Sequence, residues 1–239
     1  MTSTRTLIET MIKLGDPKRA QGVARFFKSG KGEYGEGDYF LGIRVPAITK
    51  VAKNNINISL DDVGVLLKNK WHEIRVLAVK ILALKFGSKK TSDNEKNQIY
   101  KFYLKNTKNI NNWDLVDISC YHVVGSYLLN RKAEAKRVLS KLAKSKNLWE
   151  RRIAIISTYA FIRNNDLVLT YDIADMLLED EHDLMHKAVG WMLREAGKRD
   201  GVGLKEYLTK NIAKIPRTSL RYAIERFPKS ERKRFLLMR

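Results

Sequence analysis

The sequence of 239 residues predicts an all-α protein. Prolines interrupt helices, and none occurs between Pro46 and Pro216. Apolar residues in this stretch recur at intervals of three and four, as helices require, rather than alternating as strands do. One such run comprises Val76, Val79, Leu82, Ala83 and Phe86. Similar segments also recur along the chain, which indicates repeated helical units.

Helix starts can be placed from capping residues and prolines. Asp16-Pro17 and Val45-Pro46 each indicate a start with proline in the first turn. The stretches 59–62 and 92–95 resemble capping boxes, in which a serine and an acid three residues later bind each other's backbone N–H groups. These signals predict four helices in the first half of the chain.

One segment departs from the helical pattern. Residues 28–46 hold five of the fourteen glycines. We expect a loop or hairpin inserted near 30–42 in a single domain that spans 1–239, although a plain connector is the alternative. Because the segment exceeds a typical helix-to-helix connection, we favour a position at a surface shared with a partner.

Five segments can be aligned on a common helix. They begin at Trp71, Trp113, Leu148, His182 and Arg217. The alignment places one residue of each in the same register: Arg75, Asp117, Arg152, Lys187 and Arg221. The intervals are 42, 35, 35 and 34 residues, which is typical of HEAT-like repeats. The predicted fold is therefore a curved solenoid of stacked antiparallel helix pairs.

The charge of the chain indicates a polyanionic partner. Lys and Arg number 46 against 26 Asp and Glu, which gives a net charge of +20 and a pI near 10. Nucleic acid is the first candidate, and a merely solvated basic surface is the alternative. No apolar run reaches the ~18 residues of a membrane span, and the N-terminus lacks a signal-peptide core. We expect a monomeric cytoplasmic protein that associates with the nucleoid when it binds DNA, with no membrane partner.

Few residues suit metal or covalent chemistry. The single Cys120 excludes an internal disulfide, and the histidine pair His182 and His186 lacks a third ligand at suitable spacing. Neither a phosphate-binding glycine loop nor a serine or cysteine nucleophile motif is present. We therefore expect no metal and no cofactor.

Four of the five register residues are basic, which suits a track for a phosphate backbone. HEAT-type repeats also use arginines to tie neighbouring repeats together, and this alternative applies most to Arg75 and Arg221. The C-terminal stretch 216–239 carries eight basic and two acidic residues and adds either phosphate contacts or a solvated cap. Further DNA-binding candidates are Lys50, Lys53, Arg194 and Arg217.

Asp117 is the acidic exception in the register. Trp113 lies one helical turn before it, and Trp191 lies one turn after Lys187, so two indoles are expected on either side of the carboxylate. Arg152 of the adjacent repeat would keep Asp117 ionised. Core packing is the alternative for both indoles and is the expected role of two others, Trp71 and Trp149.

Such a set suits a cationic substrate. A purine alkylated on a ring nitrogen is cationic and leaves without an acid catalyst, whereas ordinary glycosidic hydrolysis needs two carboxyl groups. One ionised aspartate can then stabilise the oxocarbenium-like transition state and orient a water molecule, with indoles stabilising the positive charge.

Four motifs in this order resemble the AlkD-type DNA alkylation repair family, HEAT-like-repeat glycosylases that remove N3- and N7-alkylated purines from double-stranded DNA. They are "FLGIRVP" at 40–46, "WDLVD" at 113–117, "LWERRIAI" at 148–155 and "KAVGWMLREAGK" at 187–198. The resemblance implies a monofunctional hydrolase.

It also implies specific residue roles. Asp117 is similar to the family's catalytic aspartate, Trp113 and Trp191 to its cleft aromatics, and Arg152 to its cleft arginine. Arg194 matches a basic position of the same cleft. Phe26 or Phe27 matches an N-terminal aromatic.

Two other functions compete with an active glycosylase. The segment Gly30 to Asp38 departs from compact family members and leaves open a non-catalytic or weakly active binder of branched or distorted DNA. A protein-binding HEAT scaffold is the third possibility, and the net charge of +20 disfavours it.

Overall fold

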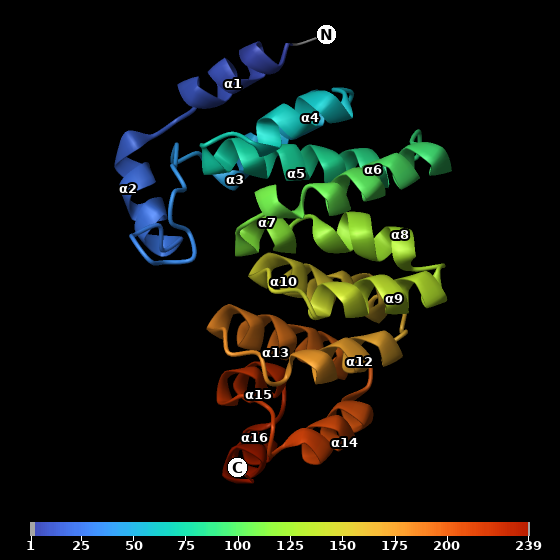
Figure 1. Cartoon of the computed structure of the whole chain (residues 1–239). Helices are drawn as coiled ribbons and strands as arrows, with labels where there is room; N and C mark the ends of the chain where they lie inside the picture. The colour runs from blue at the N-terminus through green and yellow to red at the C-terminus, as the bar shows by residue number, and fades with distance from the viewer. Residues whose placement is uncertain (1–2, 239) are drawn as a thin grey trace. The chain divides into compact units, whose positions relative to one another are not determined.

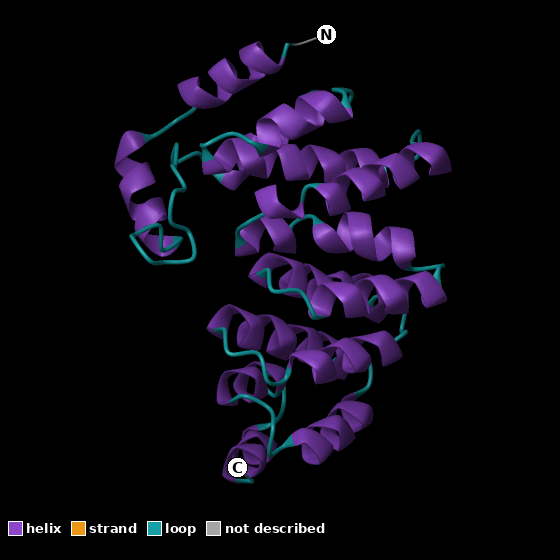
Figure 2. Ribbon diagram, viewed as in Figure 1, coloured by secondary structure: helices purple, strands orange, loops and turns teal. Residues whose placement is uncertain are grey.

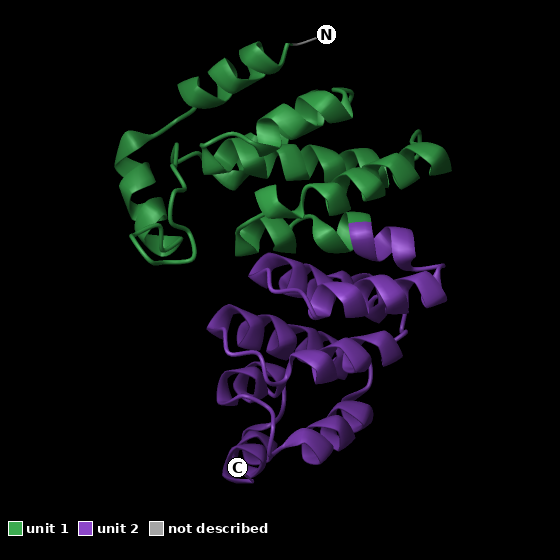
Figure 3. Ribbon diagram, viewed as in Figure 1, with its two compact units in different colours: residues 1–123 green, residues 124–239 purple. Residues whose placement is uncertain are grey.

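The structure is a computed structural model that describes residues 3–238. Within them, regular structure is helical apart from one isolated β-bridge between Tyr39 and Trp71, which confirms the all-α prediction (Figures 1 and 2). None of the helices in this range has the length and apolar character of a membrane span. Tertiary contacts divide the chain into two compact units, Met1–Val123 and Val124–Arg239 (Figure 3).

The first unit is organised around one long buried helix. Its helices are α1 (Thr4–Lys13), α2 (Pro17–Phe26), α3 (Val45–Asn54), α4 (Leu60–Leu67), α5 (His72–Gly87), α6 (Asp93–Lys105), the 3₁₀ turn η1 (Thr107–Asn109) and α7 (Trp113–Asp117). The helices α3, α4, α6 and α7 all pack against α5. Buried side chains occupy every side of α5, which is why its sequence is apolar all round.

The predicted helix starts of this unit are confirmed. Asp16 caps α2 through Arg19 N–H. Complete capping boxes at Ser59 and Ser92 begin α4 and α6. Each cap satisfies backbone donors that the first turn of a helix leaves unpaired.

The glycine-rich segment forms turns rather than a hairpin, and it returns to the start of α5. Buried Glu73 accepts the N–H groups of Leu41 at 2.8 Å and Gly42 at 2.7 Å. Gly42 has φ +78, and a Cβ there would lie 2.3 Å from the carbonyl oxygen of Asp16. Glycine is therefore required for the loop to lie this close to α2.

The second unit consists of stacked helix pairs. Its helices are α8 (Ser126–Leu128), α9 (Lys132–Ala143), α10 (Leu148–Ser157), α11 (Tyr159–Ile162), α12 (Val168–Leu177), α13 (Asp183–Gly197), α14 (Gly201–Asn211), α15 (Arg217–Ala223) and α16 (Lys229–Leu237). A π-helical turn, η2 (Tyr121–Gly125), contains the division between the units.

Layered packing in the second unit follows the predicted repeats. The aligned helices α10, α13 and α15 pack on one another in succession, and their partners α9 and α12 also pack together. The core face of α13 shows the expected spacing of three and four: Met185, Ala188, Val189, Met192, Leu193 and Ala196 are all buried. Continuity of one solenoid domain through both units stays a prediction.

Candidate functional site

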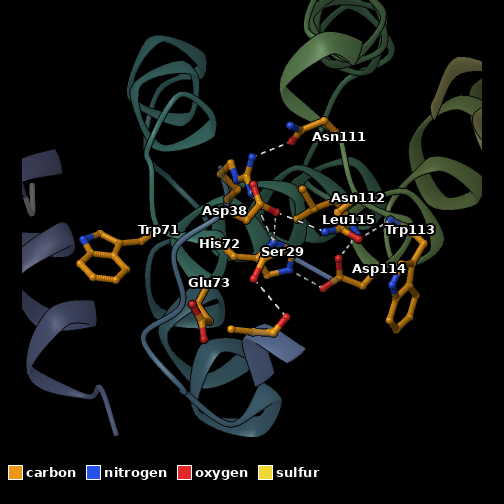
Figure 4. Close-up of polar contacts among 12 residues, drawn as sticks. Ser29, Asp38, Trp71, His72, Glu73, Asn111, Asn112, Trp113, Asp114 and Leu115 are labelled. Carbon is orange, nitrogen blue, oxygen red and sulfur yellow. Dashed lines mark hydrogen bonds and ion pairs between the residues drawn. The ribbon is translucent and has the colours of Figure 1, made fainter. Parts of the chain in front are cut away.

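Hydrogen bonds of the Asn111 and Asn112 side chains fix the position at which α7 begins. Arg75 donates to the side-chain oxygen of Asn111 at 2.6 Å, and Asn112, fully buried, donates to Asp38 at 3.2 Å (Figure 4). Asn112 also caps the helix by accepting from Trp113 N–H at 2.8 Å. The sequence "NNWDLVD" therefore begins a helix whose position is set by groups from α5 and the glycine-rich loop.

Asp38 is the centre of this network. Its carboxylate lies 2.5 Å from Arg75 Nη2, 3.3 Å from His72 Nδ1 and 3.2 Å from Asn112 Nδ2. Burial would raise the pKa of Asp38, but the hydrogen bond from His72 and the charge of Arg75 lower it instead. The loop thus places an ionised carboxylate between two cations of α5.

His72 joins the loop to α7 as a buried cation. Its Nε2 lies 2.8 Å from Asp114, and its side chain is 2% exposed. Burial opposes the charge, but the carboxylates of Asp114 and Asp38 outweigh it and raise the pKa of His72 to about 9. Both ring nitrogens therefore carry protons at neutral pH, and each donates to one carboxylate (Figure 4).

Trp113 lies in a group of aromatic rings. It stacks on Phe27 with a centroid distance of 5.1 Å, and Phe27 stacks in turn on Phe40 at 5.3 Å. Phe26 meets both Phe27 and Trp113 edge-on and is 65% exposed. A large exposed phenyl ring beside a stacked indole offers a flat aromatic surface to a ligand.

Phe26, Phe27 and Trp113 border a cavity of about 690 Å³ in the first unit. Apolar side chains dominate its lining, and Lys18, Arg19 and Lys80 supply positive charge. Burial lowers the pKa of Lys80, an effect that Asp114 partly offsets. The size and lining are those of ligand sites, which are mostly apolar with a few placed polar groups.

Asp117 ends α7 and is half-buried. It lies one turn beyond Trp113, so the expected pairing on one helix is present. The Asp117 charge contributes, after burial and Cys120, to raising the pKa of the nearby phenol of Tyr103. The carboxylate therefore sits at the edge of the core, beside a neutral phenol.

Within the second unit, α13 carries three of the remaining site candidates. Lys187, Trp191 and Arg194 follow one another at intervals of four and three and share one face of the helix. Trp191 is half-buried, with its ring centroid 6.5 Å from that of Tyr159. Arg152, 5% exposed, donates from α10 to the carbonyl oxygen of Leu184 at 2.6 Å.

A family model described as DNA alkylation repair enzyme matches residues 7–227. The chain belongs to this family. Among solved structures, a protein from Enterococcus faecalis described as a predicted DNA alkylation repair enzyme matches with a TM-score of 0.69 and 16% identity, over 90% of this chain and 97% of that one. The smu.31 protein of Streptococcus mutans UA159 matches with a TM-score of 0.55 and 16% identity, over 92% and 96%. No curated protein matches in sequence.

For this member of the DNA alkylation repair family, the basic candidates fall into two groups. Arg75, 6% exposed, is bound to Asp38 and Asn111, so the structure favours the inter-repeat tie that the sequence left as an alternative. Arg152 likewise reaches the next repeat. Lys187 pairs with Asp183 at 2.7 Å, and Arg194 pairs with Glu195 and Glu225.

The other group is exposed. Lys50, Lys53 and Arg221 have no ion-pair partner within residues 3–238, and Arg217 donates to the carbonyl oxygen of Leu236. Of the tryptophans assigned to packing, Trp149 is buried as predicted and Trp71 is half-buried against Tyr39.

Sequence reasoning missed the network of Asp38, His72 and Asp114. Asp114 lies in the first turn of α7 and is the counter-ion of His72. A signal was present, because His72 and Asp114 are separated by 42 residues, the same interval as Arg75 and Asp117. Residues at equal repeat positions in adjacent repeats become neighbours.

Proposed function

We propose that this DNA alkylation repair family member is a monofunctional DNA glycosylase that hydrolyses the N-glycosidic bond of cationic N3- or N7-alkylated purines in double-stranded DNA. Asp117 is the catalytic carboxylate and Trp113 its aromatic neighbour. In the second unit, Trp191 and Arg152 are the remaining catalytic candidates. Exposed Lys50, Lys53, Arg217 and Arg221 bind phosphates, and Lys187 and Arg194 are weaker candidates because they already have carboxylate partners.

One observation carries the proposal: Asp117 lies one turn beyond an indole on the same face of a helix whose start is fixed by buried polar contacts. A catalytic group must be held in place to act, and positioning by surrounding hydrogen bonds is the usual means. Asp114, the other carboxylate of α7, already balances the charge of His72. Its role is therefore assigned to positioning.

The chemistry needs only these groups. An alkylated purine carries its own positive charge and departs as a neutral base. The sugar then develops oxocarbenium character, which an ionised carboxylate stabilises electrostatically while it orients the attacking water. The face of an indole stabilises the same positive charge.

The test is base release from N-methylated duplex DNA by the wild type and Asp117→Asn. We expect release of 7-methylguanine or 3-methyladenine to fall by about 100-fold or more, as for loss of one electrostatic stabiliser. DNA affinity should stay close to that of the wild type, because the substitution removes no cation. A full excision rate in Asp117→Asn would overturn the assignment.

Asp114→Asn is the matched control, since it removes a carboxylate from the same helix. We expect a lower thermal unfolding midpoint with measurable excision by the folded fraction. Loss of excision in Asp114→Asn but not in Asp117→Asn would reverse the two roles. No base release by the wild type, combined with tighter binding to four-way junctions than to linear duplex, would support the non-catalytic alternative.

A further inference from the structure

A second cavity lies near the C-terminus, away from α7 in sequence. Its volume is about 290 Å³, and it is lined by Arg217, Lys229, Arg232, Lys233, Leu236 and Leu237. Every charged residue in the lining is a cation. The cavity lies between the start of α15 and one face of α16, and Arg217 joins the two helices by donating to the Leu236 carbonyl oxygen at 2.7 Å.

The cationic face of α16 follows from helical spacing. Arg232 and Lys233 lie three and four residues after Lys229, so all three share one side of the helix with the two leucines. Phe235 is fully buried and packs near Phe227. The helix is thus docked by Phe235, and its basic side stays exposed.

The acidic residue of α16 is used on a different side of the helix. Glu231 binds Lys205 of α14 at 2.8 Å, and it lies one turn before Phe235 on the docked side. Nearby Glu225 pairs with Arg194. Within residues 3–238, the structure therefore gives Lys229, Arg232 and Lys233 no carboxylate partner.

We propose that this cavity, the α15–α16 groove, binds the phosphodiester backbone of duplex DNA. Four cations around one concavity suit a polyanion such as a DNA strand, and phosphate contacts need no base recognition. The choice of DNA rests on the proposed function, while the groove adds a contact that is separate from the chemistry at Asp117. It raises affinity for DNA of any sequence and leaves the cleavage step unchanged.

A basic helix that exposes leucines can also bind an anionic membrane surface. The groove favours DNA because the apolar part is small: Leu236 is half-buried, and the exposed apolar side chains are Leu237 at 73% and Met238, outside the lining, at 43%. Membrane binding by such a helix requires a broad apolar face.

The test is the salt dependence of binding to unmodified duplex DNA, measured by fluorescence anisotropy. The variant Lys229→Gln/Arg232→Gln/Lys233→Gln removes three charges and keeps Arg217, which also holds α16 in place. Each lost phosphate contact lowers the slope of log K against log salt by about 0.9, so we expect a decrease of about 2 to 3. Affinity at about 0.1 M salt should fall on the order of a hundredfold.

A matched control removes the same charge elsewhere in the second unit. Lys141, Lys210 and Lys214 are exposed and have no carboxylate partner in residues 3–238. The variant Lys141→Gln/Lys210→Gln/Lys214→Gln should change the slope by less than about 1. Both variants should keep the wild-type thermal midpoint, because all six positions are exposed.

Equal slopes for the wild type and the groove variant, or equal losses in the groove and control variants, would refute the proposal. The proposal would also be refuted if the groove variant bound DNA as tightly as the wild type but no longer bound phosphatidylserine vesicles. The partner of the groove would then be a membrane. The binding assay does not depend on base release. A protein that releases no base but shows the expected salt slopes would therefore contradict the proposed function and support DNA binding by the groove.

Discussion

Raising the pH should remove the stabilising contribution of the His72 cation. The imidazolium is buried between Asp38 and Asp114, and its pKa in the folded protein is about 9 against an ordinary value of 6.5. Its contribution to the free energy of unfolding is therefore fully present below about pH 6.5. It declines as the pH rises through about 9, where the folded protein loses the proton.

The expected magnitude follows from the two pKa values. At about 1.4 kcal/mol per pH unit, the difference between 6.5 and about 9 corresponds to about 3 kcal/mol. The lowered pKa of Asp38 arises partly from the same ion pair with His72, so its contribution to the free energy of unfolding is not added to this value.

The assay is urea unfolding of the wild type and His72→Gln at pH 6 and pH 10, followed by circular dichroism. Lysines and tyrosines titrate in both proteins, so their effects cancel in the difference. The difference in free energy of unfolding between the wild type and the variant should be about 3 kcal/mol larger at pH 6 than at pH 10. A difference that stays constant across this range would show that the pKa of His72 is not raised in the folded protein.

Two other substitutions test the network and the loop. Asp38→Asn leaves Arg75 buried without its carboxylate partner and leaves His72 with Asp114 alone, and it should cost about 3 kcal/mol or more in urea unfolding at pH 7. A loss below about 1 kcal/mol would argue against that role. Gly42→Ala should destabilise more than Gly32→Ala, because both positions have positive φ at a cost of about 1–2 kcal/mol, but only at Gly42 would the new Cβ overlap backbone. Equal unfolding midpoints for the two glycine variants would contradict this.

The helices could be predicted because their signals are local. Capping serines, first-turn prolines and apolar spacing act within one or two turns, and the structure confirms the starts at Asp16, Ser59 and Ser92. The repeat interval also located the aligned helices correctly. A short α7 followed by a π-helical turn had no such signal, because its interruption depends on packing.

The candidate site was less predictable because its contacts are distant in sequence. Asp38 lies 34 residues from His72 and 74 from Asn112, so their meeting depends on the path of the glycine-rich loop. Burial of Arg75 followed from that same path. The sequence shows that Arg75 is basic, but only the fold shows that its guanidinium is paired with Asp38 and is therefore not available to a phosphate.

Because Asp38 lies in the glycine-rich loop, a change in loop length among relatives would also change the charge balance of the buried side chains that it contacts. A relative whose loop ended before this position would bury an imidazolium and a guanidinium without an acid between them. Asp114 would still pair with His72, but Arg75 would keep no carboxylate, so a shorter loop is expected together with neutral residues at these positions or with an acid supplied from elsewhere. These three positions are expected to change together among relatives, as one inherited unit.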